Sequence, residues 1–468
     1  MKSNTIKIIM FLTCMYFCST VFISCEDNKS VTPDNNYVNS WILDTMQTYY
    51  YWNAGMPSNP QKDRSPDDFF YSLLYKYKQL DGDRFSWIQE NYVDLLESLS
   101  GINSGDLGFE YILYRYNSNK VFGEVLYIKP GTNIENQGIK RGNAFCKING
   151  TELDLDNYLS LLQKESMTIT FNDPLLTGNT ISFNNERDVL VTKTRYAENP
   201  VFMDSIYEVN GKKIGYVVYN FFASDKGDNS KTYDKQLNSV FGRLKSEGVN
   251  SLIVDLRYNP GGSVVSSTRL ASMIVDPLST ANIFYILKFN SILGEDNGKF
   301  TSSIENENIN NIGNGLQKVC FITTRQSASA SEMLINGLKP FMNDKIITVG
   351  DTTVGKSYAS ISFYEQNNPR NKWGMQPLVA MYTNGNGEPV PAIGIIPDYL
   401  VDETAIMPKK QLGDTDEELL KAAINAISGL PVTQKMQRQS STPGASVIGT
   451  SVDKKAYSNQ SILEKIKK

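Results

Sequence analysis

The sequence contains no histidine among its 468 residues. This absence excludes a Ser-His-Asp triad, a Cys-His dyad and any zinc site with a histidine ligand. Cysteine is also scarce, with five residues and no CxxC pair, so a cysteine-based metal site has no support. A serine hydrolase built from this sequence would need a different base, and lysine is the best-known substitute.

Strong charge of either sign is missing as well. The formal net charge is −4 and the hydrophobic share is 40%, which is typical of a soluble globular protein. Nothing in the sequence is basic enough to indicate a nucleic acid partner. The length favours about two or three domains.

The N-terminus has the pattern of an exported protein. Lysines precede an apolar run, residues 8–23, that is too short to span a bilayer comfortably. The following Phe22-Ile23-Ser24-Cys25 resembles a bacterial lipoprotein processing site, although that pattern usually has Leu where this chain has Phe22. We therefore predict a signal peptide over 1–24, a lipid on Cys25, a tether over 25–36 and attachment to the outer membrane. A plain signal peptide or a membrane anchor is the alternative.

Two further features bear on the compartment. Glu26-Asp27 resembles the acidic signals that send some lipoproteins to the cell surface, so the periplasmic and the outer face both stay open. Cys146 and Cys320 lie in apolar stretches, and we expect them to be buried small hydrophobic residues rather than a disulfide or a nucleophile.

The first part of the predicted mature chain, residues 37–100, has a helical pattern. Ile42, Met46 and Tyr49 share one helical face, and Ser65-Pro66 has the form of a helix start with proline in the first turn. We predict a small N-terminal helical domain.

Residues 101–185 read as a β-rich domain. Strands are expected at 108–113 and 124–128, a loop with a short helix over 130–142, and a strand over 146–151 that ends in Asn-Gly. This run resembles a PDZ domain, in which Leu107, Gly108 and Phe109 would form the loop that binds a peptide carboxylate. A small β-rich domain that binds no peptide is the alternative.

Residues 198–430 alternate strands with helices. Buried strands are expected at 214–219, 251–256, 318–323 and 345–349, and a last helix begins at a cap at Thr415 and ends at Gly429. This alternation predicts an α/β core with a mixed, largely parallel sheet and flanking helices, into which the β-rich domain is inserted. Residues 431–468 have little hydrophobic pattern, so we expect a disordered tail.

Reactive residue types follow three of these strands. Ser331 comes after strand 318–323, where a helical pattern begins, and the N–H groups of a helix start favour an oxyanion. Gly261 and Gly262 follow strand 251–256, and glycines there can turn backbone N–H groups towards an open site. Lys356 follows strand 345–349, and desolvation would lower the pKa of its ammonium far enough for it to accept a proton. Three strands could thus bring these groups to one edge of the sheet.

The motifs together resemble the C-terminal processing peptidases, or tail-specific proteases. This chain has Leu256-Arg257-Tyr258-Asn259-Pro260-Gly261-Gly262, then Ser-Ala-Ser-Ala-Ser-Glu at 327–332, then Gly355-Lys356 and Gly394-Ile395-Ile396-Pro397-Asp398. The resemblance covers roughly residues 100–430. It implies a serine endopeptidase that acts on proteins or peptides without a cofactor.

The same resemblance assigns roles to residues. It makes Ser331 the nucleophile and Lys356 the general base, with an oxyanion hole from the backbone of Gly261, Gly262 and Glu332. Many members have Gln four residues after the lysine, where this chain has Ser360. Ser360 could orient the lysine at shorter reach, or another group could.

Two other functions are compatible with parts of the sequence. Residues 350–357 satisfy the P-loop pattern GxxxxGK[ST] after a strand, but residues 358–364 alternate like a strand, whereas a P-loop must lead into a helix. A peptide-binding lipoprotein without catalysis is the second alternative, and the presence of both Ser331 and Lys356 argues against it.

Overall fold

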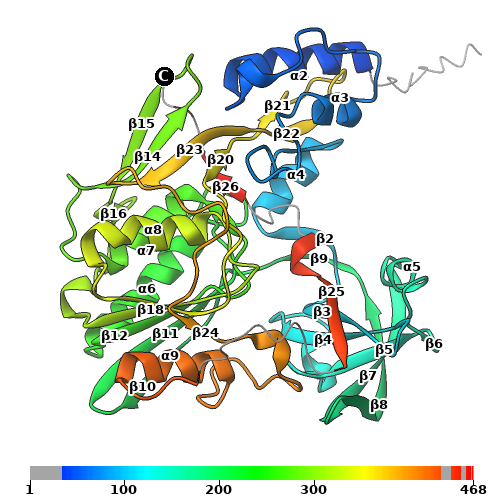
Figure 1. Cartoon of the computed structure of the whole chain (residues 1–468), viewed down its shortest axis with the longest axis vertical. Helices are drawn as coiled ribbons and strands as arrows, with labels where there is room; N and C mark the ends of the chain where they lie inside the picture. The colour runs from blue at the N-terminus through cyan, green and yellow to red at the C-terminus, as the bar shows by residue number, and fades with distance from the viewer. Residues whose placement is uncertain (1–33, 434–443, 455–459, 465, 467–468) are drawn as a thin grey trace, which may run out of the picture.

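The computed structural model describes residues 34–433, 444–454, 460–464 and 466 (Figure 1). The predicted signal peptide, Cys25 and most of the tether lie outside the described residues. Within the part of the chain that is described, no helix has the length and apolar character needed to cross a membrane.

The N-terminal part is helical, as predicted for residues 37–100. The side chain of Asp34 caps the first helix by accepting a hydrogen bond from the Tyr37 N–H at 3.1 Å, and the buried face of this helix carries Val38, Ile42 and Met46. Strand β1 pairs with β22 of the core, so the two parts share a small sheet, β1-β22-β21. The elements are α2 (Asn35–Tyr49), η1 (Asn53–Gly55), α3 (Pro66–Ser72), β1 (Trp87–Gln89), α4 (Tyr92–Leu99), β21 (Phe363–Tyr364) and β22 (Gly374–Gln376).

The β-rich part follows and has its own apolar core. Its sheet has the order β25-β3-β4-β5-β7-β8, with β6 beside β5. The rings of Phe109, Phe145 and Phe171 pack edge to face, with centroids 5.6–6.0 Å apart. The predicted strands correspond to β3, β4 and β5, but β8 continues seven residues beyond the expected boundary at 185. The elements are β2 (Ile102–Asp106), β3 (Phe109–Tyr116), β4 (Lys120–Ile128), η2 (Glu135–Gln137), β5 (Ala144–Ile148), β6 (Thr151–Glu152), α5 (Tyr158–Leu162), β7 (Ser166–Thr177), β8 (Thr180–Thr192) and β9 (Thr194–Ala197).

The core contains the largely parallel sheet that the sequence predicts. Its order is β10-β11-β12-β18-β19-β24, with every neighbouring pair parallel except β10 and β11. The last helix begins at Glu418 with Glu417 as its cap, two residues after the expected cap at Thr415, and ends at Gly429 as predicted. The elements are β10 (Val201–Val209), β11 (Lys212–Tyr219), α6 (Thr232–Ser246), β12 (Ser251–Asp255), α7 (Val264–Ile274), β18 (Lys318–Thr323), α8 (Ala330–Met342), β19 (Ile346–Gly350), β24 (Tyr399–Leu400) and α9 (Glu418–Ser428).

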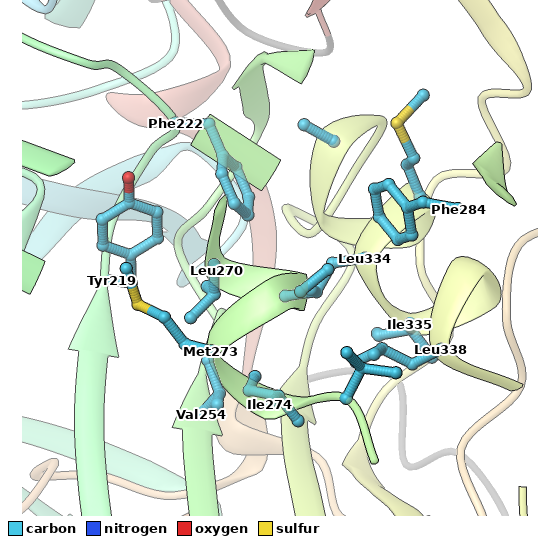
Figure 2. Close-up of a cluster of buried hydrophobic side chains, with 14 of the residues drawn as sticks. Tyr219, Phe222, Val254, Leu270, Met273, Ile274, Phe284, Leu334, Ile335 and Leu338 are labelled. Carbon is cyan, nitrogen blue, oxygen red and sulfur yellow. The ribbon is translucent and has the colours of Figure 1, made fainter. Parts of the chain in front are cut away.

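Helices cover both faces of this sheet. Val254 of β12 packs with Leu270 and Met273 of α7 and with Leu334 of α8 in one apolar cluster (Figure 2). Alternate strand residues, such as Ile253, face α9 in a second cluster. Cys320 is buried there and Cys146 is buried in the β-rich part, as expected. The two layers fix the ends of β12, β18 and β19, where the candidate site lies.

A second sheet of the core was not predicted. Its order is β13-β26-β20-β23-β14-β15, and it lies beside α7 and α8 (Figure 1). The alternation at 358–364 signals β20, but β13 and β26 have three residues each and come from distant parts of the chain, so their local sequence carries little strand signal. The elements are β13 (Gly261–Ser263), β14 (Ile283–Phe289), β15 (Glu295–Lys299), β20 (Tyr358–Ser360), β23 (Leu378–Asn384) and β26 (Gln460–Ile462), with β16 (Ser303–Ile304), β17 (Glu307–Asn308), η3 (Gly313–Gly315) and η4 (Glu403–Ala405) nearby in sequence.

The C-terminal segment corrects one prediction. We expected residues 431–468 to be disordered, and this is wrong for β25 (Ala445–Thr450) and for β26. Strand β25 pairs antiparallel with β3, and β26 pairs parallel with both β13 and β20. Each segment forms backbone hydrogen bonds with the edge of another strand. The local sequence of a polar tail does not predict this pairing, because the partner strands lie far away in the sequence.

Candidate active site

Ser331 lies in the first turn of α8, at the carboxyl end of the parallel sheet. Its Oγ donates a hydrogen bond to the Asn259 carbonyl oxygen at 3.0 Å, and Asn259 is held in turn by donating to the Tyr219 carbonyl at 2.8 Å. The preceding Ser329 has φ +62°, which is strained for a residue with a Cβ. A strained turn at Ser329 therefore places Ser331 at the start of α8, in the segment that follows strand β18.

Glu332 ties the serine turn to the lysine loop. Its carboxylate accepts hydrogen bonds from the N–H groups of Ser329 at 2.7 Å, Gly355 at 2.7 Å and Lys356 at 2.9 Å, and from the hydroxyl of Thr353. Burial raises the pKa of this carboxyl group, and these hydrogen bonds oppose that rise. One buried side chain thus brings together the loops that carry Ser331 and Lys356, which are 25 residues apart in sequence.

Lys356 has no solvent-exposed surface. Burial lowers the pKa of its ammonium to about 7, and the positive charge of Arg84 acts in the same direction, whereas the negative charges of Asp83 and Glu332 oppose the shift. Its Nζ lies 5.0 Å from the centroid of the Phe85 ring. Near neutral pH the Lys356 amine is therefore neutral in a large fraction of the molecules and is able to accept a proton.

The surroundings of Lys356 include residues that sequence reasoning missed. Arg84 donates to the Gly355 carbonyl at 2.8 Å. Asp83 is buried and accepts hydrogen bonds from the Tyr50 hydroxyl at 2.9 Å and from the Phe85 and Ser86 N–H groups. These residues precede Lys356 by about 270 positions. No motif or period marks them, so only the folded arrangement identifies the N-terminal part as one wall of the site.

Tyr382 of β23 was missed as well. Its hydroxyl lies 3.0 Å from the Ser329 carbonyl oxygen and also contacts the carbonyl oxygen of Lys356. It is buried, so it fixes the backbone on both sides of the site from behind. A tyrosine in an ordinary strand pattern gives no sequence signal for such a position.

Two of the predicted oxyanion donors already donate hydrogen bonds within the fold, contrary to expectation. The Gly261 N–H donates to the Asn259 Oδ1 at 3.0 Å, and the Glu332 N–H donates to the Ser329 side chain in a capping box. Gly262 has φ +130°, and a Cβ there would lie 2.1 Å from the Phe222 carbonyl oxygen, so glycine is required. Side-chain caps thus occupy two of the three N–H groups.

Ser360 and the loop before it bear on the third catalytic residue and on the P-loop alternative. Ser360 lies in β20 and is buried, and its carbonyl accepts a hydrogen bond from the Leu463 N–H at 2.9 Å. Residues 358–360 form a strand rather than a helix, as predicted. The N–H groups of Gly355 and Lys356 already bind the Glu332 carboxylate, so this loop cannot cradle a phosphate, and the P-loop alternative fails.

Leu107, Gly108 and Phe109 lie in the turn that leads into β3. Leu107 and Phe109 line a cavity of about 530 Å³ together with Leu159 and Leu162 of α5. The Gly108 N–H donates to the Asp106 carboxylate at 2.8 Å, so a carboxylate from the chain itself already holds this donor. The cavity is therefore lined by leucines along α5 and, beside the turn, by carboxylates that pair with the Lys129 ammonium.

Comparisons with known proteins point to one family of peptidases. Residues 213–401 match peptidase family S41, and residues 37–87 match the peptidase S41 N-terminal domain. A carboxyl-terminal-processing protease from Picosynechococcus sp. is 26% identical over 336 residues, which are 69% of this chain and 73% of that protein. A probable CtpA-like serine protease from Staphylococcus aureus is 22% identical over 67% of this chain and 61% of its own length.

One solved structure is similar over most of the chain. The crystal structure of a candidate S41 protease from Bacteroides fragilis has a TM-score of 0.70 and 25% sequence identity. The similarity covers 83% of this chain and 97% of that one, so the helical part, the β-rich part and the core recur together.

Proposed function

Because the chain belongs to peptidase family S41 and is a serine peptidase, we propose that it cleaves proteins or peptides with Ser331 as nucleophile and Lys356 as general base. The observation that carries this proposal is the fully buried Lys356, whose pKa burial lowers to about 7, in a loop joined to the Ser331 turn through Glu332. A lysine in bulk water would remain protonated at neutral pH and could not serve as a base.

The reaction follows from these positions. The neutral Lys356 amine accepts the Ser331 hydroxyl proton while Oγ attacks the substrate carbonyl carbon. The tetrahedral intermediate expels the amine leaving group, which takes the proton from the Lys356 ammonium. Neutral Lys356 then accepts a proton from the water that attacks the acyl-enzyme, and it donates this proton to the Ser331 Oγ as the carboxylic acid product leaves. Of the expected oxyanion donors, we assign Gly262, because the N–H groups of Gly261 and Glu332 are already bound within the fold.

The β-rich part is the proposed recognition domain. Its strand β3 begins at the turn that contains Leu107 and Gly108, and Phe109 is its first residue. The edge of β3 pairs antiparallel with β25 of the same chain, and PDZ domains hold peptides on such an edge in the same way. We assign this edge to the C-terminal tail of the substrate. The acidic residues near the turn, including Asp106, oppose capture of a free carboxylate, and the Lys129 ammonium beside them is already paired with Asp106, Glu110 and Glu198. Of the lysines that line the cavity, we assign Lys193 to attraction of the carboxylate.

Attachment to the outer membrane through a lipid on Cys25 completes the proposal, and its support is the sequence around that cysteine. The substrate would then meet the enzyme in the periplasm or at the cell surface.

The central test uses the chain from residue 26 onwards and an unstructured protein substrate. Cleavage should be lost in Ser331→Ala while the melting temperature stays within the error of the wild type. A fluorophosphonate probe should label the wild type but not the variant. Undiminished cleavage by the purified variant would refute the assignment of the nucleophile.

A further inference from the structure

The chain's own C-terminal segment lies beside the candidate catalytic groups. Strand β26 fills the space between β13 and β20 and pairs parallel with both. Ile462 is the partner of Ser263 on one side and of Ser360 on the other, and the Leu463 N–H donates to the Ser360 carbonyl at 2.9 Å. Leu463 is buried in the main apolar cluster of the core.

The slot that β26 fills lies between the strands that follow Asn259 and Lys356 in the chain. Strand β13 begins two residues after Asn259, whose carbonyl binds the Ser331 Oγ at 3.0 Å. Strand β20 begins two residues after Lys356. Without β26 the facing edges of β13 and β20 would lack a strand partner, and unpaired edges of this kind bind extended peptides through their backbone groups.

The same segment also covers the remaining oxyanion donor. The Gly261 carbonyl and the Ser263 N–H both bind Phe222, at 2.8 Å each. Because successive residues of a strand direct their backbone groups to opposite sides, the Gly262 N–H faces β26 instead. In agreement with this coverage, Ser331 and Lys356 are completely buried, so no substrate reaches them while every segment stays in place.

An earlier part of the segment occupies the edge proposed for recognition. Strand β25 runs antiparallel to β3 from Tyr116 towards its start, and the Ser451 N–H then donates to the Tyr111 carbonyl at 2.9 Å. Ser451 reaches the cavity that Leu107 and Phe109 line. The segment therefore takes the direction of a PDZ ligand on β3 before it reaches the slot beside Ser331.

We propose that the C-terminal segment is a built-in competitor of the substrate, with residues 460–463 in the slot where the substrate backbone binds for cleavage. This proposal rests on the proposed function, since it assigns the substrate to the same slot. A tethered segment has an effective concentration on the order of 1 mM. If the free segment binds at about 100 µM, occupation of the slot raises the apparent KM about tenfold.

The test compares full-length variants on one unstructured protein substrate. Leu463→Pro removes the N–H that binds Ser360 and the buried side chain, whereas Glu464→Ala changes an exposed neighbour and is the matched control. A chain that ends after Asn459 removes β26 altogether. We expect KM to fall about tenfold in Leu463→Pro and in the shortened chain, with kcat changed less than twofold, and no change in Glu464→Ala.

Binding is measured separately from catalysis. In the Ser331→Ala form of the shortened chain, a labelled synthetic peptide of residues 455–468 should bind, and unlabelled substrate should displace it. The same peptide should inhibit the active shortened chain competitively. Activity that is unchanged in folded Leu463→Pro and in the shortened chain, together with no peptide binding, would overturn the competitor role.

Two other outcomes are informative. Loss of activity in variants whose circular dichroism and melting are intact would make β26 a structural part of the site and would also overturn the proposal. If no form cleaves any substrate but the peptide still binds and substrate displaces it, the competitor proposal stands and the proposed catalytic mechanism fails.

Discussion

The pH dependence of cleavage offers the sharpest test of the role of Lys356. Its pKa of about 7 predicts that kcat/KM rises with pH as one proton is lost, reaches half its maximum near pH 7 and then levels off. A solvent-exposed lysine would place this midpoint near pH 10.4 instead. The assay is initial-rate cleavage of a neutral substrate from pH 5 to pH 10 at constant ionic strength.

The charge of Asp83 should set the position of this midpoint. Asp83 is the leading group that holds the pKa of Lys356 up against burial, so Asp83→Asn should move the midpoint down by about one pH unit. Asp81→Asn is the matched control, because it removes the same charge from an exposed side chain that pairs with Lys76. An unmoved midpoint in Asp83→Asn would contradict the electrostatic account of the site.

Stability gives an independent measurement of the same pKa. The pKa of Lys356 is lower in the folded than in the unfolded chain, so the unfolded chain binds more protons between about pH 7 and pH 10.5. The wild type should therefore gain stability as pH rises through this window. Lys356→Met lacks the effect and should be more stable than the wild type by up to about 5 kcal/mol at pH 6, but by only about 1 kcal/mol at pH 10.

The outcome that would refute this reasoning is specific. Denaturant unfolding at both pH values gives the difference between Lys356→Met and the wild type directly. If that difference is the same at pH 6 and pH 10, Lys356 does not lose its proton in the folded chain. A cleavage midpoint above pH 9 would lead to the same conclusion from kinetics.

The remaining predictions concern other groups of the chain. Lys356→Arg should be as inactive as Lys356→Ala, because guanidinium keeps its proton at working pH, and peptide cleavage by the Arg variant would contradict the base assignment. Glu332→Gln should lower stability by about 2–4 kcal/mol, measured by denaturant unfolding, since one amide end cannot accept the N–H groups that now bind the carboxylate. A peptide with a free C-terminus should bind a chain that ends before β25, which leaves the edge of β3 open, more tightly than its amidated form by calorimetry, and equal affinities would reject carboxylate recognition. Cys25→Ser should move the protein from the membrane to the soluble fraction, and continued sedimentation with membranes would contradict the lipid anchor.

The sequence predicted the strands of the parallel sheet and the residues at their ends because both signals are local. Strands such as β12 and β18 are continuous apolar runs, and the small residues after them mark sharp turns. The P-loop alternative was decided in the same way, since the alternation after Lys356 belongs to β20. Local pattern therefore marked the strand ends that Ser331 and Lys356 follow, and the resemblance of the motifs to the C-terminal processing peptidases singled out these two residues.

The second sheet and the tail were missed because their partners are distant. Strand β26 has three residues and gains its hydrogen bonds from β13 and β20, which lie about 200 and 100 residues earlier. Propensity cannot identify so short a strand, since pairing with an existing edge decides its structure. Two of the three expected oxyanion donors are bound within the fold for a related reason, because the Asn259 and Ser329 side chains accept hydrogen bonds from the Gly261 and Glu332 N–H groups, which a motif alone leaves open.

The groups that set reactivity had to come from distant sequence. A chain without histidine reaches a base near neutral pH only if a lysine is desolvated, and one loop cannot bury an ammonium by itself. Phe85 and Arg84 of the N-terminal part close the space around Lys356, and Asp83 limits how far its pKa falls. The N-terminal part is thus expected to control the rate at neutral pH although it supplies no reacting atom. A substitution there that loosens the wall, such as Phe85→Ala, should admit water and shift the cleavage midpoint upwards, whereas a change confined to substrate contacts would alter KM and leave the midpoint in place.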